Sequence, residues 1–524
     1  MEESLNFRTA YQGLSIMTGK NAYGDYQTPL DFCYKVCFYL KNNRHIKPSA
    51  VVEPTCGIGR FIYSSLILDA EEYYGIEINP EYCEICRNAV PDNRVKVINA
   101  DLFSFSSKSL VHDKSSILII GNPPWVTNSA LSSFDSANLP KKSNFRGLRG
   151  IDAITGESNF DICEYIILHL ANEYRNTNTT ISLLCKTSVA RKVFMELKRT
   201  DVGFSFFDIL KFDASKVFGV NADACLLLIQ LSDNAVSPDV CNVYEFDNPE
   251  RVKFQFGFSG GRFYSNLDRA DESFDGHCCF EWRQGVKHDC SKVMELTLCN
   301  GFLQNGQKER VEIENNYVYP LVKSSMFKAP VIHNFNKFVI VTQRKAREET
   351  QHLAYDAPKT WKYLNRNVEY FNDRKSSIYH NAPPFSMFGV GAYSYTRYKV
   401  GISGFYKQPL FSVLYSDDSK PVMTDDTSYF ICFESFNMAY SAMLLLNSEK
   451  VKKFLESIAF LDAKRPYTKK VLERINLQGA VEKVTVHDLK NVEQSLRLSA
   501  YISDSIYDDF RLLVKERQNC FVAR

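Results

Sequence analysis

The chain has 524 residues, which is enough for at least two domains with separate hydrophobic cores. Its composition, 45% hydrophobic and 24% charged, is that of a soluble globular protein, and no apolar run reaches the roughly 18–20 residues that cross a bilayer. The net charge of +2 gives no sign of a polyanionic partner, and the N-terminus, MEESLNFRTA, lacks the basic-then-apolar order of a secretion signal. We therefore expect an intracellular protein without a membrane span.

Fifteen cysteines are scattered singly through apolar segments. The one CxxC pair, Cys83 and Cys86, has no second pair at the spacing of a zinc site. We expect buried, reduced thiols and no metal site.

Residues from about 20 to 235 alternate short β-rich runs with segments of helical spacing. Most of the runs are continuously apolar, as in strands that are buried on both faces of a parallel sheet. The pattern predicts an α/β domain over residues 1–235, with a doubly wound, mostly parallel sheet of seven strands. The expected strands are, in chain order, 49–54, 72–78, 94–101, 115–122, 179–186, 204–212 and 223–231.

After about residue 235, aromatic and β-branched residues interleave with glycine and asparagine, and helical spacing returns only in patches. We expect a second, mixed α+β domain over residues 236–524. Between Leu321 and Leu410 there are 14 Lys or Arg against 5 Asp or Glu, a local charge of +9. This basic sector is typical of a nucleic-acid-binding face, and it is equally compatible with a solvated surface.

The first candidate site is VVEPTCGIGRF, residues 51–61. A buried strand is expected to end at Glu53, and a loop with Gly57 and Gly59 then leads into a helix. Glycines at the carboxyl edge of an open α/β sheet let the backbone approach a ligand closely. The pattern is not GxGxxG, and a lone G-x-G turn is weak evidence by itself.

The next two strands also end in acids. Glu77 ends the second strand, 18 residues beyond Gly59, where a carboxylate usually binds ribose hydroxyls. Asp101 ends the third strand, where it can accept a hydrogen bond from the amino group of adenine. Each acid alone is more typical of a solvated strand end. Three successive strands with an acid at the same edge, Glu53 included, favour a nucleoside site.

The fourth strand runs into Asn122, Pro123, Pro124 and Trp125. Two prolines cannot continue a buried strand, because neither donates a backbone hydrogen bond. A purely structural loop would pack its tryptophan on the domain. At the ligand edge, however, the Asn122 carboxamide and the Pro123 carbonyl provide two acceptors and Trp125 provides a flat face. Together they fit a planar ring that carries an NH₂ group.

In content and order these motifs resemble those of the S-adenosylmethionine-dependent DNA amino-methyltransferases of type II restriction–modification systems, in the N6-adenine subgroup with an N-terminal catalytic domain. GNPPW, residues 121–125, matches the (D/N/S)PP(Y/F/W) signature of that family. SNFDICEYIILHL (158–170) and TTISLLCKTSVARKVF (179–194) fall where later motifs are expected. The resemblance covers most of the chain and implies a class I methyltransferase fold followed by a DNA-recognition domain.

The resemblance also implies how the chain binds S-adenosylmethionine. YGDYQTPLDFC, residues 23–33, looks like the segment that contacts the methionine part, and Thr28 and Pro29 are expected to be the N-cap and first residue of a helix. The loop TCGIG departs from the AxGxG that other members often carry. The implied cofactor contacts are Tyr26, Thr28, Glu53, Cys56, Gly57, Glu77 (ribose), Asp101 (adenine amine), Leu102 (adenine ring) and Asn122.

The implied reaction is site-specific transfer of a methyl group to N6 of a flipped-out adenine, which protects DNA from a cognate restriction enzyme. Asn122, Pro123, Pro124 and Trp125 are the implied catalytic residues. Trp125 and Phe218, the latter from KVFGVNADACLLLIQL (216–231), are implied to pack against the target base.

Double-stranded DNA is the implied partner. No PD…(D/E)xK nuclease pattern is found, so we expect the restriction endonuclease to be a separate chain. A monomer in the cytoplasm of a prokaryote is the expected state. Candidate DNA-binding residues in the basic sector are Arg344, Lys345, Arg347, Arg397 and Lys399.

Three alternatives stay open. N4-cytosine methylation uses the same chemistry, but with serine at the first loop position, where this chain has Asn122. Amino-methylation of RNA or of a protein glutamine uses the same kind of loop, although the glutamine enzymes are usually much shorter. A non-catalytic DNA-binding protein on the same scaffold is expected to lose Glu53, Asp101 or Asn122, and all three are present.

Overall fold

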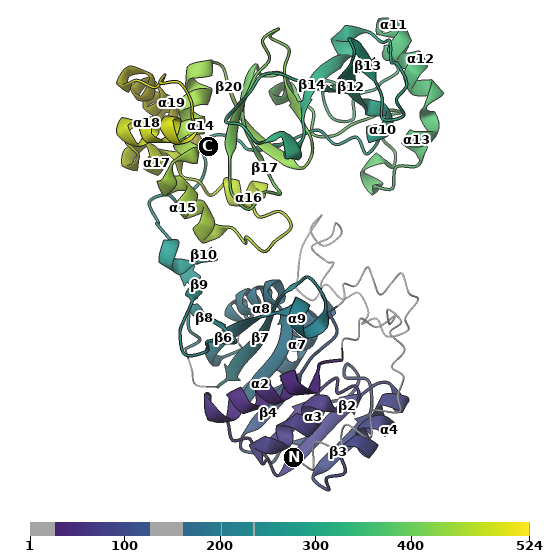
Figure 1. Cartoon of the computed structure of the whole chain (residues 1–524), viewed down its shortest axis with the longest axis vertical. Coiled ribbons are helices and arrows are strands. Elements are labelled where there is room, and N and C mark those ends of the chain that lie inside the picture. Colours follow the sequence, from purple (N-terminus) through teal and green to yellow (C-terminus); the bar gives the residue numbers. More distant parts are fainter. Residues whose placement is uncertain (1–26, 126–160, 201, 234–235, 523–524) are drawn as a thin grey trace. The chain divides into compact units, whose positions relative to one another are not determined.

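The structure, a computed structural model, describes residues 27–125, 161–200, 202–233 and 236–522. The chain divides into two compact units, Met1–Phe263 and Tyr264–Arg524 (Figure 1). Among the described residues, no helix combines the length and the apolar character that a bilayer crossing needs.

The first unit is built on one sheet of ten strands in the order β10-β9-β8-β6-β7-β5-β4-β1-β2-β3. Strands β3, β2, β1, β4 and β5 are neighbours in that order and run parallel, whereas β7 is antiparallel to both β5 and β6. The strands are β1 (Ala50–Glu53), β2 (Glu72–Glu77), β3 (Val95–Asn99), β4 (Ile117–Gly121), β5 (Thr179–Lys186), β6 (Phe204–Asp213), β7 (Asp223–Leu231), β8 (Val240–Glu245), β9 (Phe254–Ser259) and β10 (Arg262–Tyr264).

The central strands are buried because their sequences are apolar without interruption. Every residue of β1 and of β4 is buried, as expected for strands with a layer on each face. Helices α3 and α4 pack on the β1–β2–β3 half of the sheet, and α7 and α8 pack on β5. The helices of this unit are α2 (Leu30–Asn42), α3 (Arg60–Ser65), α4 (Pro80–Ala89), α7 (Ile162–Glu173), α8 (Thr187–Arg199) and α9 (Ala214–Phe218).

The sheet contains all seven predicted strands and three more. Strand β8 pairs in parallel with β6, and β9 pairs antiparallel with β8. Residues 236–263, which the sequence analysis assigned to the second domain, therefore complete the sheet of the first unit. The physical reason is that β6 would otherwise expose a free edge, which added strands cover.

Helix α2 begins one residue later than predicted. Its N-cap is Pro29, whose carbonyl accepts from the backbone N–H groups of Phe32 and Cys33. Thr28 does not cap the helix. Its carbonyl instead accepts from Nη1 of Arg60, at 2.9 Å, which ties the start of α2 to the start of α3.

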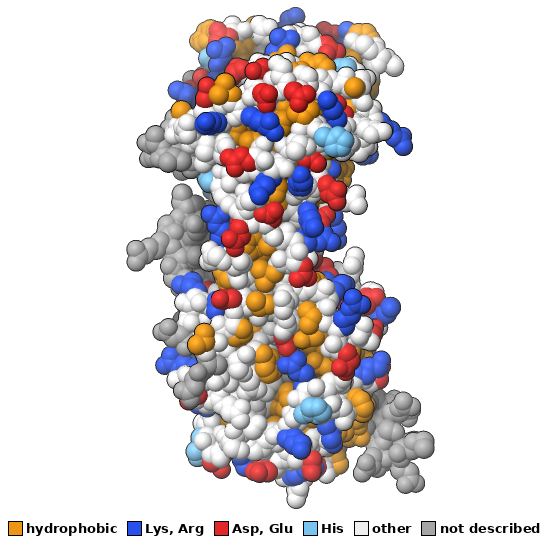
Figure 2. Space-filling view, turned by 90° about the vertical axis from the view of Figure 1, so that its left-hand side faces the viewer, with side chains coloured by type: hydrophobic (Ala, Val, Ile, Leu, Met, Phe, Trp, Pro, Cys, Tyr) orange, Lys and Arg blue, Asp and Glu red, His pale blue; other side chains and the backbone are white. Residues whose placement is uncertain are grey.

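The second unit is mixed α+β, as the sequence predicts. One sheet has the order β11-β20-β17-β18-β15, and the other has the order β13-β12-β16-β14-β19. The C-terminal helices α14, α17, α18 and α19 pack together, and α14 also covers the first of these sheets (Figure 1). Charged side chains of both signs are interspersed over the face of the protein in Figure 2, in line with its small net charge.

In the part of the chain that the structure describes, the second unit has ten strands and ten α-helices. Its strands are β11 (Arg283–Gln284), β12 (Glu295–Cys299), β13 (Phe302–Gln304), β14 (Val318–Val322), β15 (Val331–Ile332), β16 (Lys337–Ile340), β17 (Tyr398–Ser403), β18 (Phe411–Leu414), β19 (Met423–Thr424) and β20 (Ser428–Phe433). Its helices are α10 (Ser291–Met294), α11 (Leu353–Asp356), α12 (Pro358–Arg366), α13 (Val368–Asn372), α14 (Phe436–Asn447), α15 (Glu449–Ile458), α16 (Lys469–Leu472), α17 (Leu477–Lys483), α18 (Val486–Ser495) and α19 (Asp504–Val522).

Candidate active site

The loop after β1 is held tightly by two glycines. Gly57 and Gly59 have φ angles of 52° and 83°, a region that favours glycine. A Cβ atom on Gly59 would lie 2.2 Å from Sγ of Cys86 on α4, so no larger residue fits there. The loop closes a turn because Gly59 N–H donates to the carbonyl of Cys56 at 2.9 Å, and it is held to β2 because Cys56 N–H donates to the carbonyl of Ile76 at 2.9 Å. The Cys56 side chain is buried toward Gly75, so it packs in the interior and does not face a ligand.

Glu77, at the end of β2, is fixed by two backbone donors. Its Oε2 accepts from Gly57 N–H at 2.8 Å, and its Oε1 accepts from Asn79 N–H at 2.9 Å. The Asn79 side chain caps α4 by accepting from Glu81 N–H. A carboxylate oxygen has two lone pairs, so it can accept more than one hydrogen bond. The glycine loop and the predicted ribose-binding acid therefore form one rigid unit.

Glu53, at the end of β1, is almost completely buried. Its Oε2 accepts from the N–H of Ile62 in the first turn of α3, at 3.0 Å. A Cβ atom on Gly121, which has a φ of 152°, would lie 3.2 Å from Cγ of Glu53. Burial raises the pKa of the Glu53 carboxyl well above its usual range. Glu53 thus connects the glycine loop to the end of β4 beneath the ligand edge.

Asp101 and Leu102 follow β3 at the same edge. Oδ1 of Asp101 accepts from Phe103 N–H at 3.0 Å, which fixes the carboxylate in a tight turn. Leu102 is buried, and the Phe103 ring packs on Tyr165 of α7 with the centroids 5.0 Å apart. This turn provides a carboxylate beside an apolar surface, as an adenine site requires. Tyr26, the remaining predicted contact on the N-terminal segment, lies outside the described residues.

The loop after β4 carries Asn122, Pro123, Pro124 and Trp125. The indole of Trp125 is buried, and its Nε1–H donates to the carbonyl of Leu184 in β5 at 3.3 Å. The backbone of the loop is held as well, because Nζ of Lys186 donates to the Trp125 carbonyl at 3.3 Å. Neighbouring strands therefore fix the loop at the carboxyl edge.

Lys186 and Asp161 support this loop and were not assigned roles from the sequence. Lys186, the last residue of β5, forms an ion pair with Asp161 at 2.7 Å. Asp161 is also the N-cap of α7, where it accepts from Cys163 N–H. The signal for Lys186 was available, since it ends a parallel strand next to β4 just as the acids end theirs. Asp161 lies in SNFDICEYIILHL (158–170), a segment that resembles a later motif but to which the sequence assigned no residue roles.

The two aromatic residues expected to hold the target base touch each other. The rings of Trp125 and Phe218 pack edge to face, with centroids 5.4 Å apart and an angle of 75°. Phe218 ends α9, and the left-handed residue Gly219 follows it. No base fits between the rings at this distance, so a base that stacks on one of them meets the other at its edge or displaces it.

Together the strand ends form a continuous row. Along the sheet order β3-β2-β1-β4-β5, the carboxyl ends carry Asp101, Glu77, Glu53, Asn122 and Lys186 in turn. Adjacent strands lie about 4.8 Å apart, so these side chains share one edge. The predicted cofactor residues of the described part of the chain are brought together by the fold.

The predicted DNA-binding residues of the second unit separate into two groups. Arg344, Lys345, Arg347 and Arg397 are exposed, and the Arg397 guanidinium lies 5.2 Å from the Tyr398 ring centroid. Lys399 is only 1% exposed. Its ammonium group donates to the carbonyls of Ser394, at 3.0 Å, and Thr396, at 2.8 Å. Lys399 therefore holds the turn before β17 and presents no charge to a phosphate.

The buried ammonium of Lys399 predicts a pH-dependent stability. Burial lowers its pKa to about 8, whereas an unfolded lysine titrates near ~10.4. The folded state therefore binds fewer protons between these values, and the free energy of unfolding should rise with pH across this window by roughly 3 kcal/mol. Urea unfolding at pH 7.5 and pH 10 should show this increment, and Lys399→Met should remove it. The exposed Lys407→Met is the control, and parallel pH profiles for wild type and Lys399→Met would contradict the assignment.

Known proteins place this site in a family. No protein-family model matches the chain. The type II methyltransferase M.NspV of Nostoc sp. (strain ATCC 29411 / PCC 7524) is 38% identical over 469 residues, which cover 88% of this chain and 97% of that protein. The chain belongs to the type II methyltransferases.

Two further matches are consistent with this membership. This type II methyltransferase is 29% identical over 99 residues to the type II methyltransferase M.CvrRI of Paramecium bursaria Chlorella virus XZ-6E, which is 19% of this chain and 24% of that protein. Among solved structures, the type IIL restriction-modification enzyme MmeI in complex with DNA aligns with a TM-score of 0.54 and 12% identity, covering 93% of this chain and 72% of that chain. The predicted membership of the type II methyltransferases and the class I methyltransferase fold are thereby confirmed.

Proposed function

We propose that this type II methyltransferase transfers a methyl group from S-adenosylmethionine to N6 of an adenine in double-stranded DNA. The observation that carries the proposal is the row of Asp101, Glu77, Glu53 and Asn122 along four adjacent strand ends. Three acids that suit a nucleoside lie on one side of the row. On the next strand, the Asn122 carboxamide and the Pro123 carbonyl provide two acceptors for an amino group.

The residues of the row fit the cofactor. The Glu77 carboxylate, which Gly57 and Asn79 hold in place, would accept from ribose hydroxyls, and Asp101 would accept from the adenine amino group beside Leu102. The glycine loop packs closely on α4, because a side chain at Gly59 is excluded by Cys86. When bound, S-adenosylmethionine supplies an electrophilic methyl group on a positively charged sulfur. Glu53 would support the loop that holds the cofactor, because its carboxyl group accepts from Ile62 N–H at the start of α3.

The loop after β4 would prepare the amino group of the target base. The N6 nitrogen of adenine is a poor nucleophile because its lone pair is delocalised into the ring. The Asn122 carboxamide oxygen and the Pro123 carbonyl would each accept one N6 hydrogen, which favours a pyramidal nitrogen with a localised lone pair. The prolines and the Lys186 contact hold these acceptors in place before the substrate arrives, so the effect is preorganisation rather than strong basicity.

An adenine within a duplex has to leave the stack to reach this loop, at a cost of a few kcal/mol. Stacking on Trp125 would offset roughly 1–3 kcal/mol of this cost. Phe218 touches Trp125 and is thus placed to contact the same base. The exposed Arg344, Lys345 and Arg347 of the second unit would neutralise phosphates, so DNA affinity should fall with salt. MmeI, which shares the fold, is described in complex with DNA, which supports the same substrate class here.

The test of the proposal is the chemical identity of the product. The purified full chain is incubated with radiolabelled S-adenosylmethionine and DNA of random sequence, and the DNA is digested to nucleosides. We expect the label in N6-methyladenine, at one position of a short motif, and DNA carrying the mark should resist a restriction endonuclease encoded on a separate chain. Label in N4-methylcytosine, in RNA or in the protein fraction would refute the assignment of adenine in DNA.

Glu77 provides a direct test of the cofactor assignment. Glu77→Gln removes the charge that accepts from ribose hydroxyls, so the dissociation constant of S-adenosylmethionine should rise about 10- to 150-fold, or roughly 1.5–3 kcal/mol. Isothermal titration calorimetry on the folded variant measures this change. Glu84→Gln, an exposed position on α4, is the matched control and should bind as the wild type does. Equal affinities for all three proteins would place the cofactor elsewhere.

A further inference from the structure

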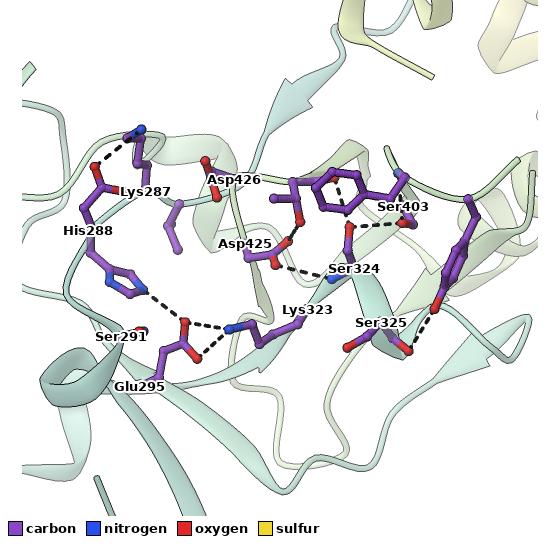
Figure 3. A pocket seen from close by; sticks show the side chains of 15 residues that line it. Lys287, His288, Ser291, Glu295, Lys323, Ser324, Ser325, Ser403, Asp425 and Asp426 are labelled. Carbon is purple, nitrogen blue, oxygen red and sulfur yellow. Dashed lines mark hydrogen bonds and ion pairs between the residues drawn. The ribbon is translucent and has the colours of Figure 1, made fainter. Parts of the chain in front are cut away.

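The second unit contains an open cavity of about 700 Å³ at the ends of strands from both of its sheets (Figure 3). Its walls come from loops at the ends of β11, β14, β17 and β19, so four segments far apart in the chain converge on it. The lining residues are Val286, Lys287, His288, Asp289, Ser291, Glu295, Lys323, Ser324, Ser325, Ser403, Phe405, Tyr406, Asp425, Asp426 and Thr427.

Several charged side chains of the cavity are already paired. Lys323 donates to both oxygens of Glu295, at 2.9 and 2.7 Å, and Nε2 of the buried His288 lies 3.7 Å from the same carboxylate. Nδ1 of His288 accepts from Cys290 N–H, and burial lowers the pKa of the ring, so it is neutral with its proton on Nε2. On this side of the cavity, the positive charge of Lys323 is therefore compensated by the negative charge of Glu295.

Asp425 is also committed to the structure. Its Oδ1 accepts from the hydroxyls of Thr427 and Ser428, at 2.8 and 2.7 Å, and its Oδ2 accepts from Ser324 N–H at 3.3 Å. The carboxylate thereby links the loop after β19 to the loop after β14. Because Asp425 binds these protein groups, it is not a candidate for contact with a ligand.

Asp426 differs from its neighbour. Among the described residues, no hydrogen bond or ion pair reaches its carboxylate, and Figure 3 shows it at the cavity without a drawn interaction. Burial and the nearby Asp425 raise its pKa, while Lys287 and Arg465 act in the opposite direction. Lys287 lies at the same cavity and pairs with Asp289 at 3.4 Å, with both side chains a third exposed. The cavity therefore offers one carboxylate without a partner among the described residues and a partly exposed ammonium group that is shared with Asp289.

The opposite wall is aromatic and cationic. Phe405 and Tyr406 follow β17, and the guanidinium of Arg465 lies 5.0 Å from the Phe405 ring centroid. The Tyr467 hydroxyl donates to the Lys407 carbonyl at 2.9 Å, which joins the two loops. Arg465 and Lys407 lie beside these aromatic residues, where cations can contact the phosphates that flank a base pair.

We propose that this cavity reads one C·G base pair of the target sequence, with Asp426 accepting from the N4 amino group of cytosine and Lys287 donating to O6 and N7 of guanine. These are the acceptor and donor that such a pair requires in the major groove. The inference rests on the proposed function, since it concerns how the same enzyme selects its DNA. It assigns sequence selection to residues outside the basic sector predicted from the sequence.

The test compares the methylation motifs of variants in a host without the mark. Wild type, Asp426→Asn, Asp426→Ala and the control Asp509→Asn, on the exposed face of α19, are expressed as full chains, and modification-sensitive sequencing gives each motif. Asparagine pairs with adenine. At one position, Asp426→Asn should therefore lose its preference for cytosine, worth about 5- to 150-fold, and accept adenine. Asp426→Ala should tolerate several bases there, and Asp509→Asn should keep the wild-type motif.

A DNA-binding measurement serves as the test for variants that methylate no DNA. Purified proteins compete for duplexes that each carry one substituted base pair of the wild-type motif. Asp426→Asn should bind one substituted duplex within about 3-fold of the original and reject the others as the wild type does. Wild-type discrimination at every position, in either measurement, would overturn the role of Asp426. A wild type that marks no DNA would instead refute the proposed function.

Discussion

Replacing Asn122 by alanine should slow methyl transfer about 10²–10³-fold and leave the binding of S-adenosylmethionine largely unchanged. The variant loses the carboxamide acceptor that would hold one N6 hydrogen and keeps only the Pro123 carbonyl. Removal of one preorganised group that acts in the transition state typically costs 10²–10³-fold in rate, about 2.7–4 kcal/mol. Single-turnover methylation of a saturating duplex measures the chemical step, and calorimetry measures cofactor affinity.

Two comparison variants make this result specific. Asn122→Asp keeps an acceptor oxygen at the same position, as the family signature allows, and should retain far more activity than alanine does. Asn42→Ala, an exposed position on α2, controls for the loss of an amide elsewhere and should be fully active. If Asn122→Ala methylated at the wild-type rate, the loop after β4 would not hold the target amine.

The order of the catalytic strands was predictable because apolar continuity and strand-end chemistry are local signals. Buried strands such as β1 and β4 are recognisable without an alternating pattern, and Glu77 and Asp101 directly follow strands. Parallel strands then place their ends along one edge. The extent of the sheet was not predictable in the same way. Residues 240–264 have the aromatic composition of the second unit, and their pairing with β6 is a long-range contact.

Whether an individual lysine is exposed or buried also depends on long-range packing. Lys186 and Lys399 both end or begin strand-like segments, yet Lys186 supports the loop after β4 and Lys399 is buried against two carbonyls. Charge counting includes Lys399 in the basic sector because it registers residue type without exposure. Asp426 was missed for a related reason, since its cavity is assembled from four loops that are distant in sequence.

Replacing Trp125 distinguishes a base-stacking residue from one that only packs on the domain. The indole is buried and bonded to the Leu184 carbonyl, so Trp125→Ala should cost about 3–5 kcal/mol of stability at most, and less where the loop collapses. A stacking role predicts a further loss in target-base binding of roughly 1–3 kcal/mol, whereas Trp125→Phe keeps an aromatic face and should stay active.

The effect of Trp125→Ala on stability can be separated from its effect on base stacking by changing the DNA substrate. A mismatch opposite the target adenine lowers the cost of extrusion, so it should restore part of the Trp125→Ala defect in kcat/KM. A defect caused only by loosened packing of Trp125 on Phe218 is the same for paired and mismatched duplexes, because the duplex does not alter the fold of the free enzyme. Rates are compared well below the melting temperature of the variant. Equal kcat/KM deficits on both duplexes would reduce Trp125 to a structural residue, and the few kcal/mol needed to hold the extruded adenine would then have to come from another part of the site.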